Sequence, residues 1–366
     1  MKYPRNDEVR MRFVSGMILT DEGFIEGYVG FQDGVVIEIG KGKPQEAEVR
    51  GIVLPTLIDA HTHIADYRVP VDLSLSIEEL VAPPNGLKHR MLRNTSDEAL
   101  FAAMEEARGI MLRRGASQFI DFREGGEKGA ALLKKCSGWP KPYVMGRPNN
   151  LCFDREEVDK VLEVADGIGV SSVSDWELEE LKELAAYVHS RGRRFAIHAS
   201  ERIREDIDDI LDLQPDFIVH MTMADIGDLQ ACASAGVPIV ACPRSNLFFG
   251  RVPPLAAMLK AEVDVALGTD NAMFNLPDML SEMEFAGRIL RSQGIKDLSP
   301  VLSMALYNGQ KLLMGKSTIG IRPGESCDFM VARWHQGDPV TDLVLRGSSS
   351  DPLMVCLGLN EWRGGT

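Results

Sequence analysis

Two histidines separated by a single residue are the clearest candidates for chemistry in this chain. His61 and His63 follow directly after the apolar run Leu54-Pro-Thr-Leu-Ile-Asp-Ala, and the whole chain has only seven histidines in 366 residues. Alternate side chains of an extended strand share a face, so both imidazoles can reach one metal ion. A pair of solvated loop histidines would show the same spacing. The interpretation as a metal site therefore depends on further ligands downstream.

Three later apolar runs end in residues of the same chemical kind. His198 closes Phe-Ala-Ile-His, His220 closes Phe-Ile-Val-His, and Asp270 closes Val-Ala-Leu-Gly-Thr-Asp. Glu201 follows His198 by three residues, where a loop can bring a carboxylate over a metal ion. Imidazole and carboxylate donors suit a divalent ion such as zinc or iron that keeps one position open for water. Binding lowers the pKa of that water toward neutrality and yields a hydroxide nucleophile.

The elements that must position these residues alternate along the chain. Between residues 115 and 272, short apolar runs alternate with longer amphipathic segments, the pattern of βα units around a parallel sheet. Ser174-Asp-Trp-Glu177 predicts a capping box for a helix that continues to Arg191-Gly192. Besides the run before His61, the candidate strands are 117–122, 142–146, 167–171, 194–198, 216–220, 238–242 and 264–268. We expect helices at 96–113, 155–164, 224–235, 254–262 and 278–291.

Eight strands with crossover helices predict an α/β fold, a closed (β/α)8 TIM-like barrel whose active site lies at the carboxyl ends of its strands. The candidate residues all stand at such strand ends and therefore at one mouth. The segments 11–53 and 320–344 are strand-like and turn-rich, and we expect them to pair into one small β-sandwich. The predicted domains are a composite β-sandwich from residues 1–54 plus 319–366 and a metal-dependent (β/α)8 catalytic barrel from residues 55–318.

Charge and composition exclude some partners. A net charge of −14 and a pI near 5.1 repel phosphate backbones and anionic lipids, so we expect no nucleic-acid or membrane partner. The start Met1–Glu8 is polar, and no apolar run approaches the about 20 residues that span a bilayer, which favours a cytoplasmic location. The six cysteines lack a Cys-x-x-Cys pair and are expected to be buried free thiols. The acidic surface is compatible with a homodimer.

At these residues the sequence resembles the amidohydrolase superfamily, and the likeness extends over nearly the whole chain. It is most similar to the branch of heterocycle aminohydrolases and chlorohydrolases that includes cytosine, guanine, S-adenosylhomocysteine and triazine aminohydrolases. The matching motifs are Gly-Ile-Val-Leu-Pro-Thr-Leu-Ile-Asp-Ala-His61-Thr-His63, His198-Ala-Ser-Glu201, His220, Cys242-Pro-Arg-Ser-Asn246-Leu and Leu267-Gly-Thr-Asp270. The resemblance implies the barrel and the terminal β-sandwich. It implies as metal ligands His61, His63, His198 and Asp270, with Glu201 and His220 managing protons.

The reaction that the resemblance implies is hydrolytic deamination of a small N-heterocycle. A metal-bound hydroxide would attack a ring carbon, and ammonia would leave. Asp270 would accept a proton from the water, and His220 would hydrogen-bond the hydroxide or polarise the leaving site. Glu201 would protonate the ring nitrogen and then pass a proton to the departing amine. The alternative within the superfamily is cyclic amide hydrolysis, such as imidazolonepropionase activity. An alternative of another class is a non-catalytic barrel binding protein, which would need no proton carriers.

A missing ligand at the fourth strand favours a single metal ion. Binuclear members of the superfamily generally carry a carboxylated lysine or another ligand there, but this strand reads Ala165-Asp-Gly-Ile-Gly-Val-Ser-Ser. We therefore expect one divalent ion, zinc in first place and iron in second. Asp166 precedes the strand interior, and we expect it to have a structural role in a turn or at a helix end.

Three arginines and one asparagine are candidates for substrate contacts. Arg123 and Arg147 follow the second and third candidate strands, and guanidinium groups bind carboxylate or phosphate in a bidentate way. In S-adenosylhomocysteine deaminases, arginines in this region are associated with the amino-acid carboxylate, so the heterocyclic substrate can carry an anionic group. The open alternative is an exposed or ion-pairing role, for example with Glu124. Arg244 and Asn246 belong to Cys-Pro-Arg-Ser-Asn, where they contact substrate or only shape the turn.

The segment 65–93, after the metal pair, contains Pro and Gly and suits a substrate lid. It departs from the acidic and aromatic pattern that resembling nucleoside deaminases place here, which argues against ribose recognition. His89, within this segment, either contacts substrate or is an exposed loop histidine. The methionine-rich run 273–283 is expected to pack as helix core.

Overall fold

The structure is a computed structural model that describes residues 11–44, 46–315 and 320–364. These residues form two compact units, one from the described parts of 1–56 and 318–366 and one from the described parts of 57–317. Within the described ranges, no helix has both the length and the apolar character needed to cross a membrane. The polar start Met1–Glu8 and the expected boundary at residues 318–319 lie outside the described residues.

The larger unit is built on one curled sheet whose neighbouring strands are all parallel. The order is β12-β11-β10-β9-β8-β7-β6-β5-β13. β12 and β13 lie at opposite ends of this order but only two residues apart in the chain, so one short stretch closes the ring. The eight predicted strands and the TIM-like barrel are confirmed. The strands are β5 (Leu57–His63), β6 (Ala116–Arg123), β7 (Lys141–Gly146), β8 (Gly167–Val170), β9 (Arg194–Ala199), β10 (Phe217–His220), β11 (Ile239–Ala241), β12 (Val265–Leu267) and β13 (Asp270–Asn271).

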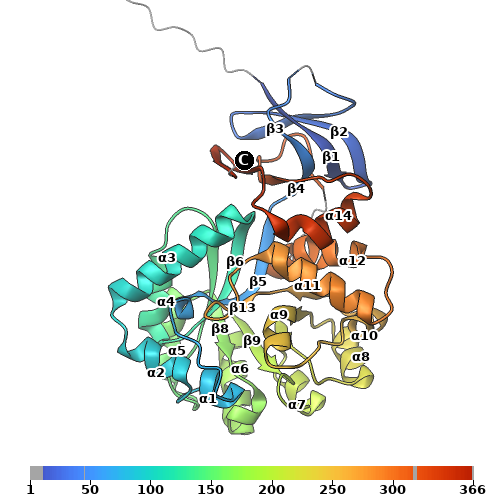
Figure 1. Ribbon diagram of the computed structural model, residues 1–366. Coiled ribbons are helices and arrows are strands. Elements are labelled where there is room, and N and C mark those ends of the chain that lie inside the picture. The colour runs from blue at the N-terminus through green and yellow to red at the C-terminus, as the bar shows by residue number, and fades with distance from the viewer. Residues whose placement is uncertain (1–10, 45, 316–319, 365–366) are drawn as a thin grey trace, which may run out of the picture. The chain divides into compact units, whose positions relative to one another are not determined.

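Helices surround this sheet and connect its strands (Figure 1). Carboxylates cap several of them. Asp154 accepts from the first turn of α5, and Asp278 does the same for α11. The five helices expected between strands are present. The helices are α1 (Ile77–Val81), α2 (Leu87–Asn94), α3 (Asp97–Arg113), α4 (Gly126–Lys134), α5 (Arg155–Val164), α6 (Leu178–Ser190), α7 (Ile207–Asp212), α8 (Ile226–Ala235), α9 (Pro243–Phe248), α10 (Leu255–Lys260), α11 (Met279–Ser292), α12 (Ser299–Leu302) and α13 (Asn308–Met314).

Two local predictions in this unit are wrong. The capping box at Ser174 does not form, because Ser174 lies in the 3-10 turn η2 (Val173–Asp175), where its hydroxyl pairs with Ser172 and its N–H donates to Glu205. α6 starts after Glu177 without a side-chain cap. The cysteines are free as expected, but Cys152 is exposed, since it lies in the loop between β7 and α5.

Side chains from alternate strand positions fill the barrel interior. Phe122, Phe217 and Val240 are fully buried there. Burying an apolar side chain of this size stabilises a fold by about 1.5–3 kcal/mol. The ring of Phe122 packs edge-on against His61 and His198, with centroids 4.6 and 4.9 Å apart. The apolar core therefore ends directly against the histidine cluster.

The smaller unit is one seven-stranded mixed sheet with the order β16-β15-β14-β4-β1-β2-β3. Both terminal segments share it, because β4 pairs parallel with β1 and antiparallel with β14. One prediction is wrong here: residues 339–344 of the strand-like tail form a helix, which Asp338 caps and Pro339 begins. The elements are β1 (Arg12–Thr20), β2 (Gly23–Gln32), β3 (Val35–Lys41), β4 (Arg50–Pro55), β14 (Phe329–Ala332), α14 (Pro339–Arg346), β15 (Met354–Leu357) and β16 (Asn360–Arg363).

Candidate metal centre and active site

The barrel carries the candidate ligands at the carboxyl ends of its strands. His61 and His63 take alternate positions of β5, which places both side chains on one face. His198 is the penultimate residue of β9, His220 ends β10, and Asp270 begins β13. None of the five is more than 8% exposed. Because parallel strands end at the same edge, segments distant in sequence meet at one mouth.

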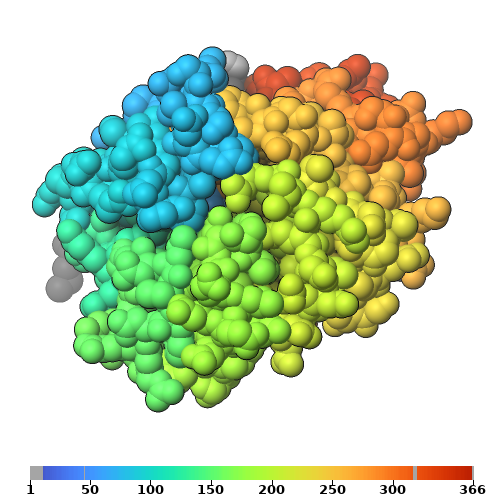
Figure 2. Space-filling view, turned by 90° about the horizontal axis from the view of Figure 1, so that it is seen from below, coloured from blue at the N-terminus to red at the C-terminus, as the bar shows by residue number. Residues whose placement is uncertain are grey.

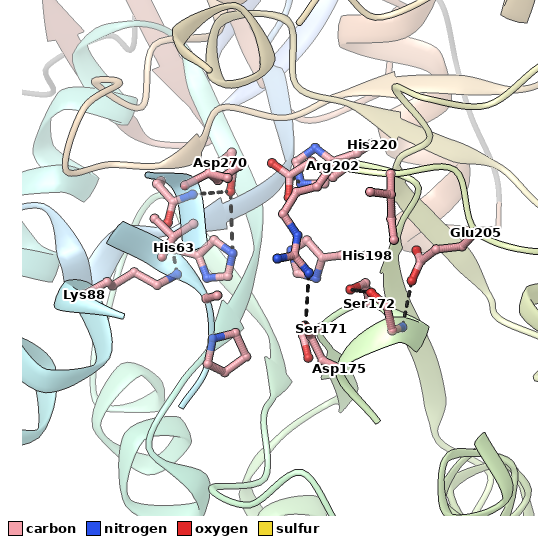
Figure 3. Close-up of a pocket in the computed structure, with 18 of the residues that line it drawn as sticks. His63, Lys88, Ser171, Ser172, Asp175, His198, Arg202, Glu205, His220 and Asp270 are labelled. Atoms are coloured by element: carbon pink, nitrogen blue, oxygen red, sulfur yellow. Dashed lines mark hydrogen bonds and ion pairs between the residues drawn. The ribbon is translucent and has the colours of Figure 1, made fainter. Parts of the chain in front are cut away.

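Four ligand atoms converge there. His61 Nε2 lies 3.2 Å from His198 Nε2 and 3.3 Å from Asp270 Oδ1. His63 Nε2 lies 3.6 Å from the same Asp270 oxygen. Figure 3 draws this contact as a dashed line. A tetrahedral zinc ion with bonds of about 2.0–2.1 Å holds its ligand atoms about 3.3–3.4 Å apart. The spacing therefore fits one divalent ion.

In two of these histidines, the contact made by Nδ1 determines which ring nitrogen carries the proton. His63 Nδ1 lies 2.9 Å from the carbonyl oxygen of Phe122, and His198 Nδ1 lies 2.7 Å from that of Val170. A carbonyl only accepts, so each Nδ1 carries the proton and each Nε2 keeps a lone pair. The lone pair of His63 Nε2 faces Asp270 Oδ1 without an intervening hydrogen, so the two repel each other, and a cation between them removes that repulsion. Such carbonyl-oriented histidines are usual in metal sites.

The charge state of the cluster also suits a cation. Burial lowers the pKa of His61 to about 3 and holds the pKa of His198 well below its usual range. Burial alone would raise the pKa of Asp270, but the hydrogen bond with His61 and the charge of His220 lower it well below the usual range. Neutral imidazoles and an ionised carboxylate are the forms in which these groups bind metals.

Glu201 and His220 form a pair beside the converging ligands. Glu201 Oε1 lies 3.6 Å from His220 Nε2. Asn246 Nδ2 lies 3.3 Å from His220 Nδ1 and offers it a hydrogen, so the imidazole proton sits on Nε2 and faces Glu201. Burial raises the pKa of Glu201, against the opposing charge of His220. A carboxyl group with a raised pKa can both give and take a proton closer to neutral pH.

Two of these residues occupy strained backbone. The φ angle is 62° at Asp270 and 77° at His220. A non-glycine residue in this left-handed region costs about 1–3 kcal/mol, although Asp and His tolerate it better than β-branched residues. Both residues stand at strand ends at the same mouth of the barrel. This indicates that their backbone conformation serves the geometry of the site at a cost in local stability.

A cavity of about 60 Å³ opens onto the candidate ligands. One wall holds His63, His198, Glu201, His220 and Asp270, and another comes from α1 and the residues after it. The surface is hollowed where the blue residues of the α1–α2 segment meet the yellow-green residues (Figure 2). The expected lid, 65–93, thus includes two short helices, and its apolar contribution to the wall is Ile77, Val81, Ala82 and Pro83.

A second cavity, of about 280 Å³, adjoins the first, since Arg147 and Pro83 line both. Arg123 lines only the second cavity and pairs with Glu124, Nη1 to Oε2 3.2 Å. Arg147 is 6% exposed, and burial lowers its pKa. Its Nε has no hydrogen-bond partner, and no carboxylate of the described residues forms an ion pair with it. An unpaired buried guanidinium is costly, which marks this wall as a place for an anion.

The structure does not bring the remaining substrate candidates to the first cavity. Arg244 pairs with buried Glu282 and donates to a backbone carbonyl, so it serves packing. Asn246 contacts His220 rather than open space. His89 is not an exposed loop residue: α2 buries it, and its Nε2 lies 3.1 Å from the carbonyl oxygen of Val81 beside the second cavity. Burial lowers its pKa to about 3.

The fourth strand offers no metal ligand. β8 reads Gly-Ile-Gly-Val, and the next residue, Ser171, has a buried hydroxyl that lines the first cavity without a partner among the described residues. Asp166 accepts from Lys134 Nζ and from the N–H of Val144, the structural role expected of it. The expectation that the run 273–283 packs as helix core holds only for its second half: Met279 and Met283 are buried in α11, whereas residues 273–278 precede the helix.

Two polar residues at the mouth, Lys88 and Asn271, were not singled out from the sequence, and Glu124 was named only as an ion-pair partner of Arg123, which it is. Glu124 directly follows β6, and Asn271 directly follows Asp270, so their places at strand ends were the available signal. Lys88 lies in α2, and nothing in its local sequence indicates that it is only 2% exposed.

Comparison with known proteins identifies the family. The model of the amidohydrolase family matches residues 52–355. An uncharacterized protein of Methanocaldococcus jannaschii is 34% identical over 81% of this chain and 80% of its own. A protein of Archaeoglobus fulgidus, named provisionally as an aminohydrolase, is 34% identical over 93% of this chain and 96% of its own.

More distant relatives have named activities. A 5-methylthioadenosine/S-adenosylhomocysteine deaminase of Pyrococcus furiosus is 27% identical over 93% of this chain and 92% of its own. An adenosine deaminase of Xanthomonas campestris, solved with bound zinc, has the same fold, with a TM-score of 0.74 at 18% identity over 95% of this chain and 92% of that one. The chain therefore belongs to the amidohydrolase family, and it is a hydrolytic enzyme that acts on carbon–nitrogen bonds.

Proposed function

We propose that this protein is a mononuclear metal-dependent hydrolase that deaminates a small N-heterocycle carrying one anionic group. The observation that carries the proposal is the convergence of three imidazole nitrogens and one carboxylate oxygen directly beside the Glu201–His220 pair. The names of the deaminase relatives support deamination as the reaction.

The metal ligands of the proposal are His61, His63, His198 and Asp270. Three imidazoles and one carboxylate suit zinc best and iron next. One ion is favoured because β8 supplies neither lysine nor histidine. When bound, the ion supplies a Lewis acid that lowers the pKa of a water molecule toward neutrality.

The chain's own residues then manage protons and orient the ring. Asp270 Oδ2, which already accepts from the hydroxyl of Ser245, is placed to take a proton from the attacking water. Glu201, with its raised pKa, gives a proton to a ring nitrogen, then takes the remaining proton of the attacking water and passes it to the departing amine. The proton that Asp270 took from the water then returns to Glu201. His220 Nε2–H donates a hydrogen bond to the oxygen that develops charge. These transfers leave the ring carbonyl and ammonia.

Arg147 supports the anionic group. In the second cavity Arg123 pairs with Glu124, and Lys128 with Asp97 at 2.8 Å, which leaves Arg147 and Arg93 without an ion-paired carboxylate among the described residues. This excess of positive charge suits an anionic group such as a carboxylate. Because Arg147 also lines the cavity of the metal ligands, it can hold this anion while the ring reaches them.

Cyclic amide hydrolysis is the second candidate, because the same ligands and proton carriers suit attack on a ring carbonyl. The two reactions differ in product. Deamination releases ammonia and keeps the ring, whereas amide hydrolysis opens the ring and releases no ammonia. The non-catalytic alternative does not fit a hydrolase family member with this full set of groups.

The test is a screen for ammonia release with purines, pyrimidines, pterins and triazines, each offered with and without a carboxylate substituent. We expect turnover of carboxylated amino-heterocycles, lost in His61→Ala. His189→Ala is the control, since this histidine lies on α6, partly exposed and away from the mouth. Ring-opened products without ammonia would show cyclic amide hydrolysis instead of deamination. Turnover retained by His61→Ala would refute the proposed site.

A further inference from the structure

Lys88 is a buried cation that has no role in the proposed reaction. It is 2% exposed, although lysine is among the residues least often buried. It belongs to α2, which follows the metal histidines in sequence but lies outside the barrel strands. Figure 3 shows its side chain reaching from this helix toward His63. The cost of burying an ammonium group calls for partners that hold it there.

Its partners form a closed circuit of polar contacts with two candidate metal ligands. Lys88 Nζ lies 2.8 Å from Glu124 Oε1, and that oxygen lies 2.8 Å from His63 Nδ1. On the other side, Lys88 Nζ donates to Asn271 Oδ1 at 3.0 Å, and Asn271 Nδ2 donates to Asp270 Oδ1 at 2.9 Å. The contact between His63 Nε2 and Asp270 Oδ1, at 3.6 Å, closes the circuit.

The circuit joins the metal ligands to the segment that covers the cavity. α1 and α2 are neighbours in the chain, separated by residues 82–86, and they contact each other. α1 and residues 82–83 form a wall of the first cavity, and Lys88 itself lines it. Removal of Lys88 from its place would therefore free the covering segment and take a partner from both Glu124 and Asn271.

We propose that Lys88 is a positioning residue that ties the covering segment, residues 77–94, to the metal ligands His63 and Asp270. The proposal rests on the proposed metal site. The orientation of the two ligands and the closure of the covering segment are then coupled. By linkage, whatever fixes the ligands also fixes the segment, and the effect is reciprocal.

Hydrogen exchange tests this coupling without measuring the reaction. Wild-type protein and Lys88→Met are compared in the metal-loaded and the metal-free state, with zinc as the metal. In wild type, we expect metal removal to speed the exchange of amides in 87–94 by about 5-fold or more, the lower end of usual site-to-site coupling. In Lys88→Met these amides exchange fast in both states, so the ratio falls to near one. Zinc binding weakens by about 10-fold, the usual effect of losing a residue that orients a ligand.

Matched variants separate coupling from general damage. Lys135→Met removes an exposed lysine and keeps the wild-type ratio. Asn271→Ala breaks only the Asp270 side of the circuit, so it lowers the ratio partially and serves as the test if Lys88→Met does not fold. Amides of α5 are the internal reference for global opening.

Three outcomes contradict the proposal. A wild-type ratio of one shows that the segment does not sense the metal, and a wild-type ratio retained in Lys88→Met shows that Lys88 does not carry the coupling. Metal analysis of the same samples separates this from a failure of the proposed function. Wild-type protein that binds no zinc would overturn both the proposed metal site and the role of Lys88. Zinc-loaded protein in which residues 87–94 exchange as fast as in the metal-free state would overturn the role of Lys88 alone.

Discussion

Replacing Arg147 by Met should raise stability and lower activity at the same time. Arg147 is 6% exposed and has no ion-pair partner among the described residues, so its charge costs free energy in the folded protein. Met keeps much of the apolar stem and removes that charge. We expect Arg147→Met to raise the free energy of unfolding by about 1–2 kcal/mol, equal to a Tm increase of about 2–8 °C.

Arg123→Met is the matched control and should have the opposite effect on stability. Arg123 is equally buried, but it pairs with Glu124, so its loss removes a partner from a buried carboxylate. We expect a decrease of about 1–3 kcal/mol, limited because Lys88 still contacts Glu124. The two arginines lie at the ends of neighbouring strands and line the same cavity. The difference in stability between the two variants therefore reports the effect of the ion pair with Glu124.

The activity of Arg147→Met should depend on the charge of the substrate. A charge-assisted hydrogen bond contributes about 1.5–3 kcal/mol, so kcat/KM for a carboxylated heterocycle should fall by about 10- to 150-fold. The uncharged analogue should lose little. Thermal unfolding and steady-state kinetics on the same preparations provide both numbers. A destabilised Arg147→Met with equal losses for both substrates would refute the reasoning, because the guanidinium would then be a packing group.

Three further predictions concern acid, proton transfer and metal. Burial depresses the pKa of His89 from 6.5 to about 3, so below pH 6.5 the unfolded chain binds a proton at this residue that the folded chain does not, and wild type loses stability as the pH falls. Between pH 8 and pH 5, the free energy of unfolding of His89→Gln should therefore rise by about 2 kcal/mol relative to that of wild type, measured by denaturant titration. A difference between the two proteins that does not change with pH would rule this out. Glu201→Gln should lower kcat by about 10²- to 10⁴-fold with unchanged metal content, and loss of metal would make Glu201 a ligand instead. Chelation should lower Tm by about 5–10 °C if the metal was present at about 100 times its Kd, whereas an unchanged Tm would speak against a site in the folded core.

Much of the fold and the positions of the candidate ligands followed from the sequence, for a topological reason. Each of His198, His220 and Asp270 stands at the end of an apolar run, and parallel strands in a barrel end at one mouth whatever the lengths of their connections. A residue's place at a strand end therefore predicts its neighbours across the barrel. The pairing of His220 with Glu201 is an example, since a short loop after β9 carries the carboxylate to the next strand.

The roles of Arg147, Arg244 and Lys88 were less predictable, because they depend on partners far away in the sequence. Arg147 and Arg244 both follow barrel strands, yet Arg244 is held by Glu282, and Arg147 has no such carboxylate. Nothing near either arginine distinguishes them. Lys88 depends in the same way on how α2 packs.

The central claim is that one divalent ion held by His61, His63, His198 and Asp270 drives hydrolytic deamination. The most direct measurement titrates zinc into metal-free protein while following ammonia release from a carboxylated amino-heterocycle that the enzyme turns over. Activity should rise linearly and level off at one equivalent of zinc, with the ring of the product intact. Ammonia release at full rate from protein shown to be metal-free, or a break at two equivalents, would contradict the claim.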